Sequence, residues 1–141
     1  MSDATEQLET TLRRNGYSLT KPRRVVFDAL QDQEPQVMQE LVARCSIVDR
    51  ASIYRTVSLF EQLGIIQRLQ IGWKYKLELT DTFAHHHHHA SCMRCGKVIP
   101  LPEDDRLEKQ LYAMAKAHNF QLQSHQLELN GLCEDCQALA I

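Results

Sequence analysis

Apolar side chains recur three and four residues apart along the first sixty positions, which predicts four successive helices. The first and the fourth should end at Asn15-Gly16 and at Gly64, because glycine and asparagine commonly terminate helices. Thr20 and Asp49 are the expected N-terminal caps of the second and the fourth. The expected helices are residues 6–14, the segment from Thr20 through Leu30, residues 36–45 and residues 50–63.

The fourth predicted helix has two unlike faces. Ile53, Val57 and Phe60 fall within one narrow arc at about 100° per residue, so we expect them to face a core. The opposite arc carries a single charge and comprises Ala51, Arg55, Ser58 and Gln62, with Tyr54 at its edge. Such a face suits a helix that lies against base edges and phosphates. A plain solvent-exposed face fits the same pattern equally well.

Residues 65–79 alternate on either side of Gly72, which predicts a two-stranded hairpin. Lys74 and Lys76 share one face of its second strand, where they can reach a phosphate backbone. Helices followed by such a hairpin, or wing, make up a winged helix-turn-helix domain. We expect this domain to occupy residues 1–82, with a hinge at residues 80–84.

Residues 83–141 predict a small α/β domain, so the whole chain is expected to be of the α+β class. A strand should run through the histidines at 85–89, and because side chains alternate along a strand, odd- and even-numbered histidines should point to opposite faces. Its core is too small to be stable alone, so we expect metal and a partner subunit to support it. A second strand is expected at 98–101, followed by a helix that opens at Glu103-Asp104-Asp105 and carries an apolar stripe of Leu107, Leu111, Met114 and Ala115. One or two further strands are expected around His125, and they include Phe120, Leu122, Leu127 and Leu129.

Paired cysteines are the clearest chemical signal in the chain. Cys92/Cys95 and Cys133/Cys136 each have two residues between the thiols, a spacing that lets both sulfurs reach one ion. Two such pairs supply the four thiolates of a closed structural zinc site. Disulfides and a redox-active pair are the alternatives, and a reducing cytosol disfavours the disulfides.

Composition narrows the class of protein. No segment resembles a signal peptide or approaches the ~20 apolar residues that cross a bilayer, so we expect a cytoplasmic protein with no membrane partner. The net charge is −2, and residues 1–82 hold eleven basic and eleven acidic side chains. A DNA-binding face must therefore come from local clustering of charge.

Two other functions would also use metal-binding residues. A zinc-dependent enzyme is disfavoured because the sequence has no His-Glu-x-x-His helix or other hydrolytic motif, so we predict neither enzymatic activity nor a small organic substrate. A cytosolic metal storage or delivery protein could use the histidine run, which is internal and therefore unlike an engineered tag. Such a protein would need neither Tyr54-Arg55 on an exposed helix nor a wing with lysines.

Several motifs together resemble the ferric uptake regulator family of metal-dependent repressors. Ala51-Ser52-Ile53-Tyr54-Arg55 is similar to the Ala-Thr-Val-Tyr-Arg motif of the family's recognition helix, and Thr20-Lys21-Pro22-Arg23 resembles the start of its second helix. The histidine run, residues 92–99, His125 and Cys133 follow in the family's order. The resemblance implies a homodimer that binds operator DNA and represses transcription when a divalent metal occupies a regulatory site. With the wing lysines, the expected DNA-binding residues are Lys21, Arg23, Ala51, Ser52, Tyr54, Arg55, Lys74 and Lys76.

The same resemblance implies where the metals bind. The family's regulatory site falls on His86, His88, Glu108 and His125, a donor set that suits iron, zinc, cobalt or manganese. His88 stands where many members have aspartate. Because an imidazole replaces a carboxylate there, the ligand set carries one negative charge fewer. We expect structural Zn²⁺ on the cysteines and Fe²⁺ or Zn²⁺ at the regulatory site, with Mn²⁺ as a further option.

A second family site would use Glu78, His87 and His89, with a carboxylate from around Glu103. Gln36 stands in place of its usual histidine ligand, which predicts a weakened, remodelled or lost site. Peroxide-sensing relatives place an aspartate where Glu78 aligns. The resemblance therefore favours metal regulation over peroxide sensing.

Overall fold

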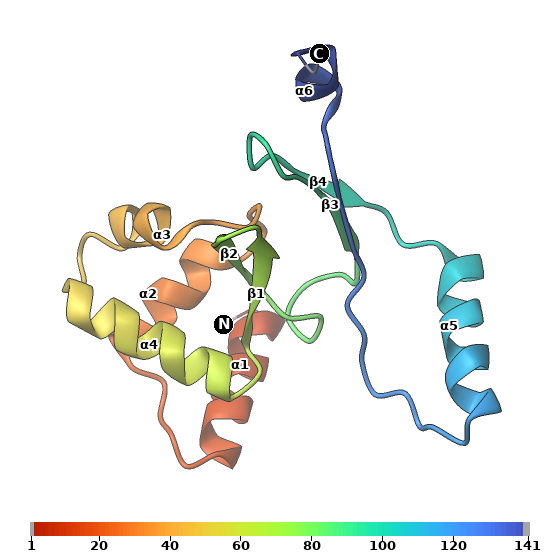
Figure 1. The fold of residues 1–141 in the computed structure, drawn as a ribbon. Helices are drawn as coiled ribbons and strands as arrows, with labels where there is room; N and C mark the ends of the chain where they lie inside the picture. The colour runs from red at the N-terminus through yellow and green to blue at the C-terminus, as the bar shows by residue number, and fades with distance from the viewer. Residues whose placement is uncertain (1, 140–141) are drawn as a thin grey trace. The chain divides into compact units, whose positions relative to one another are not determined.

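The structure, a computed structural model, describes residues 2–139. It divides into two compact units, Met1–His85 and His86–Ile141. Figure 1 shows helices and a hairpin in the first unit and a small sheet with two helices in the second. No helix in the described part of the chain is both long enough and apolar enough to span a bilayer.

The first unit begins with four helices: α1 (Asp3–Arg14), α2 (Lys21–Leu30), α3 (Met38–Arg44) and α4 (Arg50–Gln62). Three of them have N-terminal caps, because the side chains of Ser2, Thr20 and Asp49 each accept a hydrogen bond from a backbone N–H three residues on. Their apolar faces meet in one core. Its fully buried large side chains include Leu8, Leu12, Phe27, Leu41, Ile53 and Phe60.

The wing follows as β1 (Ile66–Ile71) and β2 (Lys74–Leu79), which pair antiparallel from Ile66↔Leu79 to Ile71↔Lys74. Gly64 separates α4 from the wing with a φ of 73°, a left-handed conformation that costs glycine little. Leu77 lies in the core and fastens β2 to the helices. The predicted winged helix-turn-helix fold is confirmed.

The starts of two helices differ from the sequence-based expectation. The first helix begins at Asp3 because Ser2 caps it, rather than at residue 6. The third begins at Met38 because the backbone of Gln36 is already paired: its N–H donates to the Leu77 carbonyl at 2.9 Å and its carbonyl accepts from the Leu77 N–H at 2.7 Å. The segment before α3 is therefore an extension of the wing.

The second unit contains β3 (His88–Cys92), β4 (Val98–Leu101), α5 (Asp105–Ala117), β5 (Glu128–Gly131) and α6 (Glu134–Leu139). Strand β3 is central, with β4 antiparallel on one side and β5 parallel on the other. One or two strands were expected around His125, and the structure forms only β5. Residues 120–127 pair with no other strand within the described chain, and a strand needs a neighbour for its backbone hydrogen bonds. The first strand begins at His88 rather than His85.

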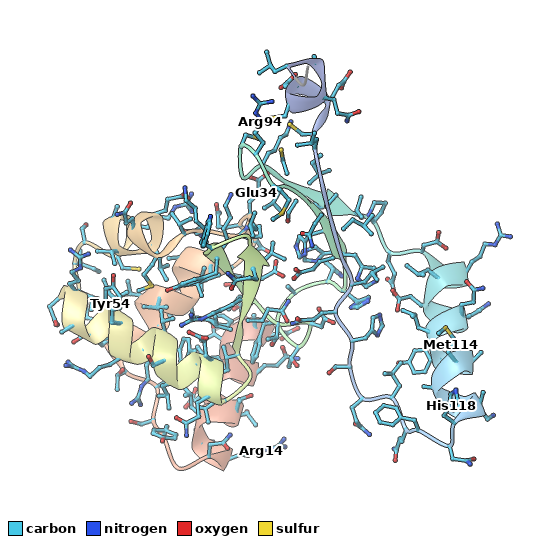
Figure 2. The ribbon with its side chains drawn as sticks, in the orientation of Figure 1. Arg14, Glu34, Tyr54, Arg94, Met114 and His118 are labelled. Atoms are coloured by element: carbon cyan, nitrogen blue, oxygen red, sulfur yellow. The ribbon has the colours of Figure 1, made fainter. Side chains whose placement is uncertain are left out.

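The second unit has little apolar core of its own. Its cluster of buried apolar residues consists of Cys92, Cys133 and Cys136. No residue of α5 is buried, and Met114, marked in Figure 2, is 63% exposed. The expectation that this unit needs additional support is consistent with this packing.

Candidate metal centres and nucleic-acid interface

The four paired cysteines lie together at one end of the second unit. Cys92 ends β3, and the tight turn to Cys95 is closed by a hydrogen bond from the Gly96 N–H to the Cys92 carbonyl at 2.9 Å. Cys133 and Cys136 follow β5. The sulfurs of Cys95 and Cys133 are 3.7 Å apart, and all four sulfurs lie within 4.8 Å of one another. A tetrahedron with Zn–S bonds of ~2.3 Å has edges of ~3.8 Å, so the set fits zinc.

The protonation of these thiols also favours a bound cation. Hydrogen bonds from the backbone of Cys95 and Cys133 lower the pKa of Cys92 to about 5. Burial, followed by contacts with the other three sulfurs, raises the pKa of Cys136 to about 12. Four adjacent thiols therefore cannot all ionise by themselves, whereas a divalent cation at their centre would stabilise four thiolates. No disulfide forms within residues 2–139.

A second cluster comprises the predicted regulatory ligands and lies wholly within the second unit. The Nε2 atoms of His86 and His88 are 3.1 and 2.7 Å from Glu108 Oε1, and His125 Nε2 is 2.6 Å from Glu108 Oε2. His86 Nε2 and His125 Nε2 face each other at 3.2 Å. Four ligands at ~2.0–2.1 Å from a tetrahedral metal stand ~3.3 Å apart. The three imidazoles and one carboxylate thus fit a divalent ion.

Glu108 is the common partner of the three histidines. Burial alone would raise the pKa of its carboxyl, but hydrogen bonds with His88 and His86 and the charge of His125 lower that pKa further than burial raises it. The carboxylate is therefore ionised at neutral pH. In the metal-free unit, the ionised Glu108 carboxylate stabilises the fold. This stabilisation is fully present at pH values above the ordinary pKa of a carboxyl group, and it is lost as the pH falls through the lowered pKa of Glu108.

The alternation of the histidine run determines which rings meet. His86 and His88 have ring centroids 4.7 Å apart, and His87 and His89 have centroids 4.5 Å apart. The pairs therefore separate as the period of a strand predicts, even though regular pairing begins only at His88.

The proposed second site is less complete. Glu78 belongs to the first unit, where it is buried and accepts a hydrogen bond from Gln67 Nε2 at 2.8 Å. Glu103 is exposed in the loop before α5 and joins none of the ligand groups among the described residues. Gln36 is buried and its amide nitrogen donates to the Ala29 carbonyl at 2.8 Å, a structural role that its position in the sequence did not reveal. The second site remains a prediction.

Helix α4 presents the two faces that its sequence predicts. Ile53, Val57 and Phe60 are buried, whereas Ala51, Arg55, Ser58 and Gln62 are exposed. Tyr54, marked on α4 in Figure 2, is 42% exposed. This division of the helix is confirmed.

Hydrogen bonds at the start of α4 order part of its exposed face. Asp49 Oδ1 accepts from the Ser52 hydroxyl at 2.6 Å, and Ser52 Oγ accepts from Arg55 Nη2 at 3.1 Å. The Arg50 guanidinium lies 5.7 Å from the centre of the Tyr54 ring. Ser52 thus positions Arg55, a role that its place in the motif alone does not show.

The other predicted DNA-binding residues differ in exposure. Lys21 and Lys74 are exposed, and Lys76 is half-buried. Arg23 is already engaged, because its Nη1 donates to the Ser18 carbonyl at 2.6 Å. A further arginine on the wing, Arg68, is paired with Glu61 at 2.7 Å.

Comparison with known proteins identifies the family that has this architecture. The profile of the ferric uptake regulator family matches residues 14–130 of the chain. The chain belongs to the ferric uptake regulator family. Members of the ferric uptake regulator family are metal-responsive transcriptional regulators that bind DNA as dimers.

Individual family members resemble the chain along most of its length. The ferric uptake regulation protein of Bordetella parapertussis is 34% identical over 144 residues, which cover 97% of this chain and 98% of that protein. The ferric uptake regulator of Vibrio cholerae shares 29% identity at a TM-score of 0.69 and covers 89% of this chain and 99% of its own. The ferric uptake regulator of Pseudomonas aeruginosa, whose structure was solved with manganese, shares 26% identity at a TM-score of 0.76. This match covers 95% of this chain and 99% of that one.

Proposed function

We propose that this protein is a homodimeric, cytoplasmic repressor that binds operator DNA when a divalent metal occupies His86, His88, Glu108 and His125. The observation that carries the proposal is the convergence of these four ligands from segments that are far apart in the sequence, with each histidine Nε2 2.6–3.1 Å from a carboxylate oxygen of Glu108. Structural zinc on Cys92, Cys95, Cys133 and Cys136 is a separate part of the proposal. Metal storage is a weaker alternative, because storage does not require the exposed arginine and tyrosine of α4.

The proposed coupling follows from where the ligands lie in the chain. His86 is the first residue of the second unit and follows the boundary between the two units directly. His125 lies in an irregular segment and Glu108 on α5. A metal held by all of them restrains the chain just after this boundary, and so favours one arrangement of the two DNA-binding domains of a dimer. Coupling of ~1–3 kcal/mol corresponds to a 5- to 150-fold gain in DNA affinity.

A metal panel tests the proposal. Protein that retains its thiolate-bound metal is titrated anaerobically with Fe²⁺, Zn²⁺, Mn²⁺, Co²⁺ and Ni²⁺ at buffered free concentrations. DNA binding is measured on a duplex selected from random sequences by the metal-loaded protein, and on an unrelated duplex of equal length. We expect at least one metal to strengthen binding to the selected duplex. No strengthening by any of the five would refute the proposed function.

Substitutions on α4 should separate sequence readout from general affinity. Arg55→Ala and Tyr54→Ala are each expected to cost ~1–3 kcal/mol on the selected duplex, because contacts with base edges are lost. Lys76→Ala should weaken selected and unrelated duplexes alike and reduce the salt dependence. Competition assays between the two duplexes measure the difference. If both helix variants keep full discrimination, α4 is not the reading element.

Acidification should abolish metal activation below about pH 6. A free imidazole gains its proton near pH ~6.5, and protons compete with metal for all three histidines. Glu108 does not set this limit, because its pKa is lowered. Titration with Co²⁺, followed by its absorption spectrum, should show affinity falling with a dependence that approaches three protons per ion, one for each histidine. An affinity that stays constant between pH 7 and 5 would contradict imidazole ligation.

A further inference from the structure

The tip of the wing carries an aromatic side chain that the fold does not use. Trp73 is the only tryptophan in the chain, and 97% of it is exposed. Single exposed apolar side chains are common, but an indole exposes a large apolar area to water. The position of Trp73 on the wing and the charges around it indicate which kind of partner contacts the indole.

The turn that carries Trp73 is held firmly. Ile71 pairs with Lys74, so Gly72 and Trp73 form a two-residue connection, and Gly72 has a φ of 61°. A glycine with positive φ at the first position is typical of the tight turns that continue the twist of a hairpin. The Gln70 side-chain amide donates to the Gly72 carbonyl at 2.9 Å. The indole is therefore presented on an ordered tip, and covering it costs little backbone entropy.

The charge around this tip is one-sided. Residues 62–77 contain Arg68, Lys74 and Lys76 and no acidic residue. Arg68 is compensated by Glu61 and stacks over Tyr75, 4.1 Å from the ring centre. Lys74 is exposed directly beside Trp73. An apolar side chain flanked by uncompensated lysine matches a polyanion with apolar interior surfaces, which describes duplex DNA.

The dimensions of the wing fit the spacing of DNA grooves. Each strand has six residues. At ~3.3 Å per residue, the hairpin extends ~17–20 Å from its base. Half of the ~34 Å repeat of B-DNA, the step from a major groove to the next minor groove, is about 17 Å.

We infer that Trp73 is a DNA-contacting residue that inserts its indole into the minor groove next to the major groove read by α4. Proteins often place apolar wedges in the minor groove, and the indole N–H can donate to the acceptors that line A·T pairs there. Because minor-groove contacts discriminate weakly between sequences, Trp73 adds affinity more than specificity. This inference rests on the proposed function and adds a residue outside the recognition helix.

The single tryptophan provides a direct test. Metal-loaded protein is mixed with the selected and unrelated duplexes described above, and indole fluorescence and its quenching by acrylamide are followed until gel shift shows a complete complex. We expect the fluorescence to change and the indole to become protected from acrylamide on both duplexes. Addition of metal without DNA should leave the accessibility unchanged.

Affinities of variants, measured with labelled duplex, complete the test. Trp73→Ala should weaken binding about 5- to 150-fold on both duplexes, the range that contacts between an aromatic side chain and bases contribute, and Trp73→Phe should restore most of the loss. The salt dependence should not change, because no charge is removed, whereas the adjacent control Lys74→Ala should reduce the salt slope by about one. Thermal unfolding of Trp73→Ala should match the wild type, since the side chain packs on nothing.

Three results would overturn the inference while the proposed function stands. They are an indole equally accessible in a complete complex, an affinity for Trp73→Ala within twofold of wild type, and protection produced by metal alone, which would assign Trp73 to a contact within the protein. Wild-type protein that binds no duplex with any metal would instead overturn the proposed function, and this inference with it.

Discussion

Replacing Cys133 and Cys136 together with serine is expected to remove the bound zinc, unfold the second unit and abolish the dimer in one step. The buried apolar cluster of this unit consists of cysteines from the same set of four, so little else holds it together. Structural zinc contributes ~10–16 kcal/mol in small zinc-dependent domains, which is as large as the ~5–15 kcal/mol that stabilises a whole domain. Zinc content by mass spectrometry, mass by light scattering and amide exchange of residues 86–139 measure the three effects.

Cys45→Ala is the matched control for the loss of a cysteine. Cys45 is fully buried in the first unit, where burial raises the pKa of its thiol and its Sγ lies 3.9 Å from the Val25 carbonyl. This variant should lose some stability in the first unit and keep its zinc and its dimeric state. If the double variant at 133 and 136 still holds one tight zinc per chain and stays dimeric, the cysteines are not the structural site.

Glu108→Ala or His125→Ala should give a folded, zinc-loaded dimer that no longer gains DNA affinity when metal is added. The thiolate cluster is built from other residues, so folding and sensing should separate. The expected loss is the whole metal-dependent gain, about 5- to 150-fold. Binding to the selected duplex with and without metal, alongside zinc content and mass, gives the result.

His118→Ala is the matched control for the loss of an imidazole. His118 is exposed just after α5 and belongs to none of the ligand groups among the described residues, so its removal should leave activation intact. Full activation in the His125 variant would contradict the assignment. Regulation would then belong to the other pair of histidines, His87 and His89, together with Glu78.

Much of the fold was predictable because its signals are local. Helix caps at Thr20 and Asp49 and the glycine after α4 act within a few residues of the chain, and their sequence assignments match the structure. The two faces of α4 follow from a single periodicity. The period of a strand likewise sorted the histidines into two pairs, because neighbouring side chains must point in opposite directions.

Other features depended on partners that are distant in sequence. The spacing within each cysteine pair shows that two sulfurs can meet, but the approach of Cys95 to Cys133 requires the parallel pairing of β3 with β5. Glu108 occupies an ordinary position of an amphipathic helix, and only the family resemblance singled it out before the structure placed it between three imidazoles.

The sequence by itself determined the helices of the first unit, the wing, the metal chemistry and the family, since each depends on residue type at short spacing. Tertiary structure alone decided that Gln36 extends the wing rather than begins a helix, and that residues 120–127 form no strand within the chain. It also decided that Trp73 packs on nothing. The physical reason is the same in each case: a backbone hydrogen bond or a buried surface needs a partner, and local sequence does not state where the chain brings one.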